Sequence, residues 1–181
     1  AHLGEAPARA VSHREDVIAA DEHVDLADLE VDAAVLAGVD AFREKGCDGV
    51  IALGGGSPID CAKGIALLAS HAPPLEQYAF LRGGNSKITA LKPPLIAIPT
   101  TAGTGSEVGR GSVIVLEDGR KLGFLSPHLL PKVALCDPEL TLGLPPVLTA
   151  ATGMDAMAHC IETFLSPLVN PPAEAIALDG L

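Results

Sequence analysis

The sequence has no tryptophan and few aromatic residues of any kind, which make up 3% of its 181 residues. Basic residues are also scarce, since 12 Lys and Arg stand against 23 Asp and Glu, for a formal net charge of -11. Nucleic-acid binders need a cationic surface for phosphates, often with aromatic stacking platforms, and this chain offers neither. With 48% hydrophobic residues, the composition favours a globular protein that does not bind nucleic acid.

Long apolar runs are absent as well. The stretch from Ile65 to Ala69 is typical of those present, far short of the ~20 residues that a membrane-spanning helix requires. The first residues lack a basic segment followed by an apolar one, which is the pattern of a secretory signal. We therefore expect a cytoplasmic protein without a membrane partner.

Several catalytic and metal-binding signatures are missing. The chain has no GxSxG or HExxH motif, and its four cysteines form no CxxC or Cys/His pair of the zinc-finger type. The cysteines are therefore expected to be buried, reduced thiols without redox chemistry: Cys47, Cys61, Cys136 and Cys160.

The pattern of apolar residues predicts an α/β fold. Val35, Val39 and Phe42 share one face of a helix that Gly46 can end. The following elements are a buried strand at 50–53, a helix at 58–70 and a second buried strand at 95–98. Three more strands are expected at 113–116, 121–125 and 133–136, with a turn at 117–119, and together they predict a mixed sheet.

The two ends of the chain differ from this α/β region. Residues 1–32 are strongly acidic, show no sustained apolar period and are interpreted as a poorly ordered lead-in. After Leu144, Pro145-Pro146 can start a helix, and residues 154–164 are helix-forming. We therefore divide the chain into a lead-in at 1–32, an α/β domain at 33–144 and the start of a helical domain at 145–181.

The first candidate site is the glycine turn Gly54-Gly55-Gly56-Ser57, which follows the first buried strand. Glycines at a strand end allow a phosphate to approach the backbone, and the next helix presents free N–H groups to an anion. Ser57 and Asp60 also have the spacing of a capping box, with Pro58 at the first helical position. The spacing is neither GxGxxG nor a Walker A loop, so a simple strand-to-helix turn remains the alternative.

Two other segments could contribute to chemistry. The loop from Thr100 to Glu107 follows the second buried strand, at the edge where open α/β sheets bind ligands. Its hydroxyls could bind phosphate, ribose or nicotinamide, or they could only satisfy local backbone groups. Asp155, His159 and Glu162 form a polar stripe on one helical face, which could bind a divalent metal or simply face water.

Taken together, three segments resemble the iron-containing (group III) alcohol dehydrogenase family. They are GGGSPIDCAK at 54–63, PTTAGTGSE at 99–107 and GMDAMAHCIE at 153–162, and the similarity runs from about Ala33 to Leu181. The resemblance implies a Rossmann-like dinucleotide-binding domain followed by an all-helical metal-binding domain, with the active site in the cleft between them.

The resemblance also implies roles for individual residues. Gly54, Gly55, Gly56, Ser57 and Asp60 would border the pyrophosphate of NAD or NADP. Thr100, Thr101 and Thr104 would line its ribose and nicotinamide side, and Lys121 would approach the cofactor. Asp155 and His159 would be two ligands of Fe²⁺, or of Zn²⁺ in a relative acting on polyols, and no other catalytic residue is assigned. The implied reaction is reversible hydride transfer between a small primary alcohol and nicotinamide, and a homodimer is expected.

Two departures from the family pattern affect these expectations. Residues 1–32 do not look like the family's first βαβ unit, which holds the acidic residue that contacts the adenine ribose. The family's other two metal-binding histidines lie beyond Leu181, and no histidine follows His159. We therefore expect a truncated gene product or fragment with an unrelated lead-in. The alternatives to an enzyme are a non-catalytic nucleotide-binding fragment and an inert one.

Overall fold

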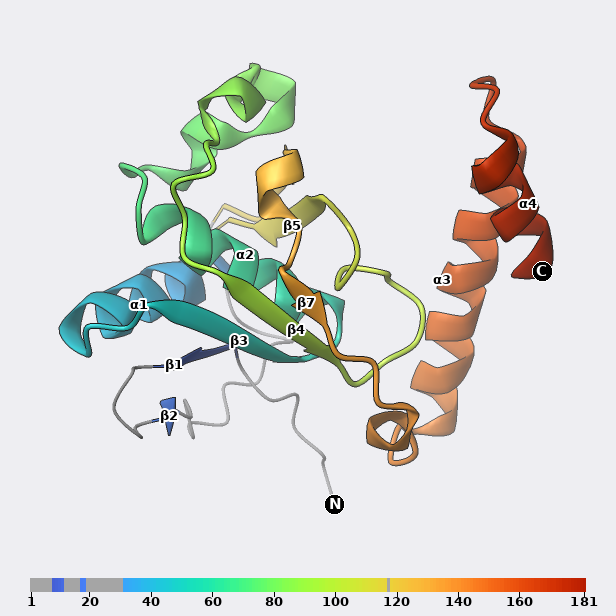
Figure 1. The fold of residues 1–181 in the computed structure, drawn as a ribbon, viewed down its shortest axis with the longest axis horizontal. Helices are drawn as coiled ribbons and strands as arrows, with labels where there is room; N and C mark the ends of the chain where they lie inside the picture. The colour runs from blue at the N-terminus through green and yellow to red at the C-terminus, as the bar shows by residue number, and fades with distance from the viewer. Residues whose placement is uncertain (1–7, 12–16, 19–30, 117) are drawn as a thin grey trace.

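The fold is taken from a computed structural model that describes residues 8–11, 17–18, 31–116 and 118–181. Its main sheet has five strands in the order β2-β1-β3-β4-β7 (Figure 1). Strands β3, β4 and β7 are parallel, whereas β1 is antiparallel to both β2 and β3. The bounds are Ala8–Val11 for β1, Val17–Ile18 for β2, Gly49–Gly54 for β3, Leu95–Pro99 for β4 and Val133–Ala134 for β7.

Two helices, α1 (Val31–Glu44) and α2 (Gly56–Leu68), pack against the sheet and each other. Alternate residues of β3 and β4 are buried, including Val50 and Ala52 in β3 and Leu95 and Ala97 in β4, while the residues between them are only half-buried. The buried residues therefore mark the face of the sheet that the described helices cover. The helices approach closely at Gly38, where an added Cβ would overlap the side chain of Ile65.

A short hairpin lies on the far side of α2. Strands β5 (Gly111–Val115) and β6 (Lys121–Leu125) are antiparallel and form a separate two-stranded sheet. Its inward residues Ile114 and Phe124 are buried in the same apolar cluster as the helices. Helix α2 is therefore enclosed between the main sheet and the hairpin, and nearly all its residues are buried.

Short 3-10 turns connect the larger elements. Three of them, η1 (Leu75–Tyr78), η2 (Phe80–Arg82) and η3 (Gly84–Lys87), form a cluster between α2 and β4, and η2 contacts β6. Two more, η4 (Pro127–Leu129) and η5 (Pro138–Thr141), lie on either side of β7.

The last two helices, α3 (Pro146–Phe164) and α4 (Pro171–Asp179), lie side by side at one end of the molecule (Figure 1). Most of their large apolar side chains are exposed, among them Met154, Ile161 and Phe164. Within the described ranges, no helix is long and apolar enough to cross a membrane.

The structure confirms the α/β class and most of the expected elements, and it corrects three expectations. Residues 8–11 and 17–18 of the lead-in are strands, while residues 1–7, 12–16 and 19–30 lie outside the described part. The hairpin forms its own sheet, so β1 rather than β5 or β6 makes the main sheet mixed. The last strand covers only Val133–Ala134, because just two of its residues pair with β4.

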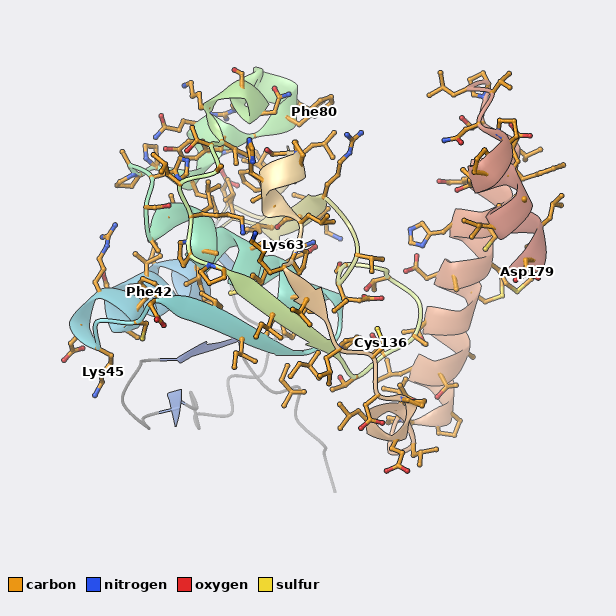
Figure 2. The ribbon with its side chains drawn as sticks, in the orientation of Figure 1. Phe42, Lys45, Lys63, Phe80, Cys136 and Asp179 are labelled. Atoms are coloured by element: carbon orange, nitrogen blue, oxygen red, sulfur yellow. The ribbon has the colours of Figure 1, made fainter. Side chains whose placement is uncertain are left out.

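The cysteines are less uniform than expected. Cys47 and Cys61 are buried, but Cys160 is only half-buried and Cys136, on the segment after β7, is exposed (Figure 2). Burial, with a smaller effect of the neighbouring Asp60 carboxylate, raises the pKa of the Cys61 thiol to about 12. The thiolate, which is the reactive form, is therefore almost absent at Cys61 near neutral pH.

We predict that a maleimide reagent at pH 7–8 labels Cys136 rapidly and labels Cys61 only after the chain is unfolded in denaturant. Peptide mass spectrometry after timed quenching measures both rates. A Cys136→Ser variant should lose the rapid phase. Labelling of Cys61 at the rate of Cys136 in the native chain would contradict the burial of α2.

Candidate functional site

The parallel pairing of β3 and β4 brings two of the predicted segments together. Gly54 is in register with Pro99, and the N–H of Thr100 donates a hydrogen bond of 3.0 Å to the carbonyl oxygen of Gly54. The glycine turn and the threonine loop therefore leave the same edge of the sheet. They touch at Gly56, where a Cβ would lie 2.7 Å from Cγ2 of Thr104. This close contact is the local reason for a glycine at position 56.

The glycine turn leaves the start of α2 open. Gly54 has a φ of 150°, which favours glycine, and Gly55 is the N-cap residue. No side chain caps the helix, and its first turn has no acidic residue. The first N–H groups of a helix and its positive dipole end form a site for an anion, so this turn can bind a phosphate group.

The predicted capping box is wrong. The helix begins at Gly56, so Ser57 lies within its first turn with an exposed side chain rather than at the N-cap. The Asp60 carboxylate accepts its backbone hydrogen bond from Val113, in β5, instead of reaching back to the start of the helix. The tertiary contact with β5 outcompetes the local one that the spacing suggested.

Two threonine hydroxyls of the loop differ in their hydrogen bonds. Oγ1 of Thr104 accepts a hydrogen bond of 3.3 Å from the N–H of Ser106, which is the structural role that the sequence left open. Oγ1 of Thr101 is buried and has no hydrogen-bond partner among the described residues. A buried hydroxyl without a partner is costly, so Thr101 is suited to bind a polar group of a ligand.

A buried ion pair ties α2 to the hairpin. Lys63 is 1% exposed, its Nζ lies 3.5 Å from Oδ1 of Asp60, and it donates to the carbonyl oxygens of Gly109 and Gly111 at 3.1 and 2.6 Å. Burial raises the pKa of Asp60 and lowers that of Lys63, while their mutual attraction opposes both changes. Oδ2 of Asp60 thus accepts a hydrogen bond from Val113, whereas its buried Oδ1 has no hydrogen-bond partner among the described residues.

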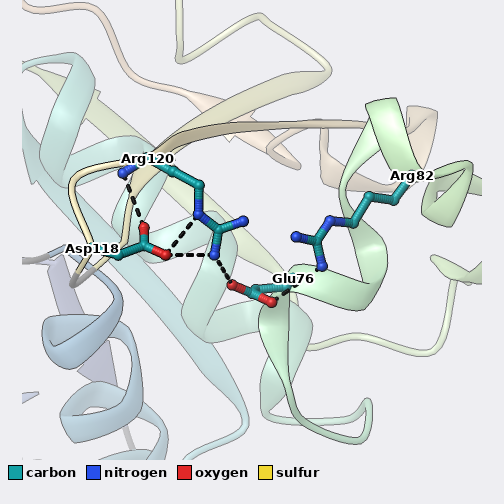
Figure 3. A network of polar contacts seen from close by, with 4 residues as sticks. All are labelled: Glu76, Arg82, Asp118 and Arg120. Carbon is teal, nitrogen blue, oxygen red and sulfur yellow. Dashed lines mark hydrogen bonds and ion pairs between the residues drawn. The ribbon is translucent and has the colours of Figure 1, made fainter.

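A surface network holds the turn of the hairpin. Glu76, in η1, binds both Arg82 and Arg120, at 3.2 and 2.7 Å, and Arg120 also binds Asp118 (Figure 3). The hydrogen bonds from Arg120 hold the pKa of Asp118 below its usual range. Lys121 comes directly after Arg120, at the start of β6, where it pairs with Val115. Among the described residues, no bond joins it to the glycine turn or to the threonine loop.

A pocket of about 340 Å³ opens between the threonine loop and the hairpin. Its polar wall includes Asp60, Thr104 and Ser106, and Phe80 and Phe124 form part of its apolar wall. Thr104, which lines the pocket, is also the residue that an added Cβ at Gly56 would contact.

Helix α3 packs against the threonine loop. A Cβ at Gly103 would collide with the carbonyl oxygen of Thr152, and Nδ1 of His159 lies 3.3 Å from the carbonyl oxygen of Gly103. Because a carbonyl oxygen only accepts, Nδ1 carries the proton in this bond and Nε2 of the neutral ring keeps its lone pair. Metal-binding histidines commonly have this arrangement, with one ring nitrogen bonded to a carbonyl oxygen.

The third predicted segment is only partly assembled. Asp155 and His159 lie one helical turn apart on α3, and His159 and Glu162 line a pocket of about 380 Å³ between α3 and α4. The described residues contain no group of three or more His, Cys, Asp and Glu side chains that could hold a metal ion. The potential donors Asp155, His159 and Glu162 are thus not gathered into a group of three, and fewer is too few for a specific site.

Comparison with known proteins accounts for this arrangement of loops. The sequence model described as "Iron-containing alcohol dehydrogenase" matches residues 16–138. The chain belongs to this family. The match begins closer to the N-terminus than the resemblance at Ala33 suggested, so part of the lead-in is family sequence.

Individual relatives agree with the family assignment. The chain is 69% identical over 140 residues to a 4-hydroxybutyrate dehydrogenase of Cupriavidus necator, covering 77% of this chain and 37% of the relative. It is 42% identical over 151 residues to a 1,3-propanediol dehydrogenase of Klebsiella pneumoniae, covering 83% and 38%.

A solved structure of a sulfoacetaldehyde reductase from Bifidobacterium kashiwanohense, in complex with NAD⁺, matches the fold with a TM-score of 0.74. It is 37% identical and covers 81% of this chain and 38% of the reductase. The chain thus spans somewhat more than a third of the length of these relatives.

Sequence reasoning missed one residue that organises the site. Lys63 closes the GGGSPIDCAK segment, and no local pattern distinguishes it from a solvated lysine on a helix. The one weak signal was its place three residues after Asp60 on a largely apolar helix, a spacing that lets the two side chains pair.

We predict that Gly103→Ala weakens the contact between α3 and the threonine loop, because the added methyl group meets the backbone of Thr152. Overpacking of this kind costs about 1–3 kcal/mol. Urea unfolding followed by circular dichroism measures the loss. Gly153→Ala is the control, because open space surrounds Gly153 on α3. Alanine at this helical position should stabilise the chain by up to ~1 kcal/mol. Equal effects of the two variants would contradict the packing described.

Proposed function

We propose that this chain contributes the cofactor-binding part of an NAD(P)-linked alcohol dehydrogenase that interconverts a small primary alcohol and its aldehyde. The observation that carries this proposal is the open N-terminus of α2, which has no side-chain cap and lies beside the threonine loop. Family membership and a structural relative solved with NAD⁺ support the same conclusion. Residues 33–144 form the cofactor-binding domain in this proposal, and residues 145–181 begin the helical domain.

The residues fit a dinucleotide in two places. The N–H groups of Gly56 and Ser57, at the start of α2, bind the pyrophosphate, and the glycines at 54 and 55 let it approach the backbone. The buried Oγ1 of Thr101 binds a polar group on the ribose or nicotinamide side, with Thr100 and Thr104 beside it. When bound, the nicotinamide ring supplies the hydride acceptor or donor of the reaction. Lys121, exposed at the start of β6, approaches the cofactor in this proposal.

The metal site is incomplete in the described residues. Asp155 and His159 are suited to Fe²⁺ or Zn²⁺ as a carboxylate and an imidazole, with Nδ1 of His159 held by the Gly103 carbonyl. A specific site needs at least one more protein donor. We therefore assign these two residues as ligands and attribute no step of the reaction to the metal.

The substrate class follows from the named relatives. 4-Hydroxybutyrate and 1,3-propanediol are both short primary alcohols that have a second polar group at the other end. We propose a substrate of this class. A second candidate function, nucleotide binding without catalysis, is favoured by the incomplete metal site.

We predict that Gly55→Asp lowers the affinity of the chain for both NAD and ADP. The backbone at Gly55 (φ -78°, ψ -160°) is accessible to any residue, and aspartate is at least as good an N-cap as glycine. Its charge would face the pyrophosphate, where repulsion at an effective dielectric of ~20 costs a few kcal/mol and lowers affinity by at least about tenfold.

Calorimetric titration of NAD and ADP tests this prediction, with thermal unfolding as the measure of stability. Gly49→Ala is the matched control because it lies at the opposite end of β3, and its Cβ would make ordinary contacts with Pro94. Unchanged binding in Gly55→Asp would exclude the α2 N-terminus as the phosphate site.

For the metal, we predict that the chain binds Zn²⁺ weakly and that His159→Ala removes this binding. His128→Ala is the control, since His128 is an exposed histidine on η4 outside the α3 helix. Calorimetric titration with Zn²⁺ measures both variants. Equal binding by His159→Ala and the unaltered chain would show that His159 is not a ligand.

A further inference from the structure

The second turn of α2 is joined to the segment 109–113 by four hydrogen bonds. Lys63 Nζ donates to the carbonyl oxygens of Gly109 and Gly111, Oδ2 of Asp60 accepts from the N–H of Val113 at 2.9 Å, and Oγ of Ser112 donates to the backbone carbonyl oxygen of Asp60 at 3.1 Å. We call this set of bonds the α2 clamp. Figure 2 shows Lys63 near the centre of the molecule.

The clamp fastens the far end of the threonine loop. The near end is held by the pairing of β4 with β3 and by the bond from Thr100 to Gly54. Within the loop, the backbone bonds on the far side are short-range: Val108 N–H to the Gly105 carbonyl at 3.1 Å and Gly109 N–H to the Ser106 carbonyl at 3.3 Å. Helix α3 contacts the loop at Gly103, and its far end is held by the clamp and by the Ser126 N–H, which donates to the Arg110 carbonyl at 3.1 Å. Lys63 contributes two of the four clamp bonds.

Burying this ion pair has a physical cost, which makes a purely stabilising role a poor explanation. Taking both charges out of water costs several kcal/mol per ion, and apolar residues in their place are often as stable or more so. What apolar residues cannot supply is a donor for the two carbonyl oxygens, at 3.1 and 2.6 Å from Nζ, which define where the loop ends and β5 begins.

We propose that Asp60 and Lys63 are positioning residues, which hold the far end of the threonine loop so that its hydroxyls stay placed for the ribose and nicotinamide half of NAD. This inference rests on the proposed function. It gives Asp60 a role in addition to the expected one beside the pyrophosphate, since the Asp60 carboxylate is bonded to Val113 and paired with Lys63.

The proposal separates the two halves of the cofactor. In this proposal the pyrophosphate binds at the glycine turn, which the clamp does not hold. The nicotinamide and the ribose attached to it bind at the threonine loop, which the clamp holds. Loss of the clamp should therefore weaken the binding of NAD and leave the binding of ADP nearly unchanged. If the clamp only stabilised the fold, its loss would lower the fraction of folded chain. The apparent affinities for NAD and for ADP would then fall together.

The test uses Lys63→Met, which keeps an unbranched side chain but has no donor, and the double variant Asp60→Asn/Lys63→Met. The double variant leaves no buried charge without a partner, so it should be more stable than the single one. Lys87→Met is the control, because Lys87 is an exposed lysine in η3. NAD and ADP are titrated into each chain by calorimetry after thermal unfolding shows that it is folded.

We expect both Lys63 variants to lose about tenfold or more in NAD affinity, as for a hydrogen bond from a charged donor, with ADP affinity changed less than about twofold. Amide hydrogen exchange is a second readout that needs no ligand. It should become at least about tenfold faster at Ser106, Val108 and Gly109 and stay unchanged at Ile51 in β3.

Each other outcome overturns part of the argument. If the double variant binds NAD as the unaltered chain does, or if its loop amides exchange at the original rate, the clamp does not position the loop. If the unaltered chain binds neither NAD nor ADP, the proposed function itself fails, and the positioning role fails with it. Parallel losses for NAD and ADP would show a structural role only.

Discussion

The site depends on the parallel pairing of β3 with β4. In parallel strands the carboxyl ends lie at the same edge, and the register of Gly54 with Pro99 makes both strands end together. The glycine turn and the threonine loop, which are more than 40 positions apart in the sequence, therefore begin side by side. A shift of one residue in this register would separate Thr100 from Gly54 and turn the side chains of β4 to the opposite face. This pairing is what brings a second loop to the uncapped start of α2.

Helix α2 connects this edge to the rest of the molecule. Its N-terminus has no side-chain cap, nearly all its residues are buried, and its second turn is bonded to the hairpin through Asp60 and Lys63. In the proposed function, one helix thus provides both the anion site and an anchor of the neighbouring loop. The loop then contacts α3 at Gly103, and His159 bonds to the same residue. A continuous set of contacts therefore runs from the buried ion pair to the potential metal ligand.

Most of the fold could be predicted from local patterns, because buried strands and amphipathic helices leave strong signals. The helix carrying Val35 and Val39, the strand at 50–53 and the helix after Pro146 all agree with the structure. The errors share a physical cause. The spacing of Ser57 and Asp60 suggested a capping box, but a long-range hydrogen bond to Val113 competes for the same carboxylate. The hairpin leaves the main sheet because α2 lies between them, and no local pattern records which face an element packs on.

The sequence by itself determined the family, the α/β class and the three segments that could carry chemistry, because glycine turns, threonine-rich loops and helical polar stripes depend on neighbours in the chain. Only the tertiary structure decided what those residues touch. It placed two of the segments at one sheet edge, left the start of α2 without a cap and buried Lys63 against two carbonyl oxygens. These outcomes depend on contacts between residues such as Lys63 and Gly111, 48 positions apart, where chain connectivity gives no constraint and packing alone selects the partner.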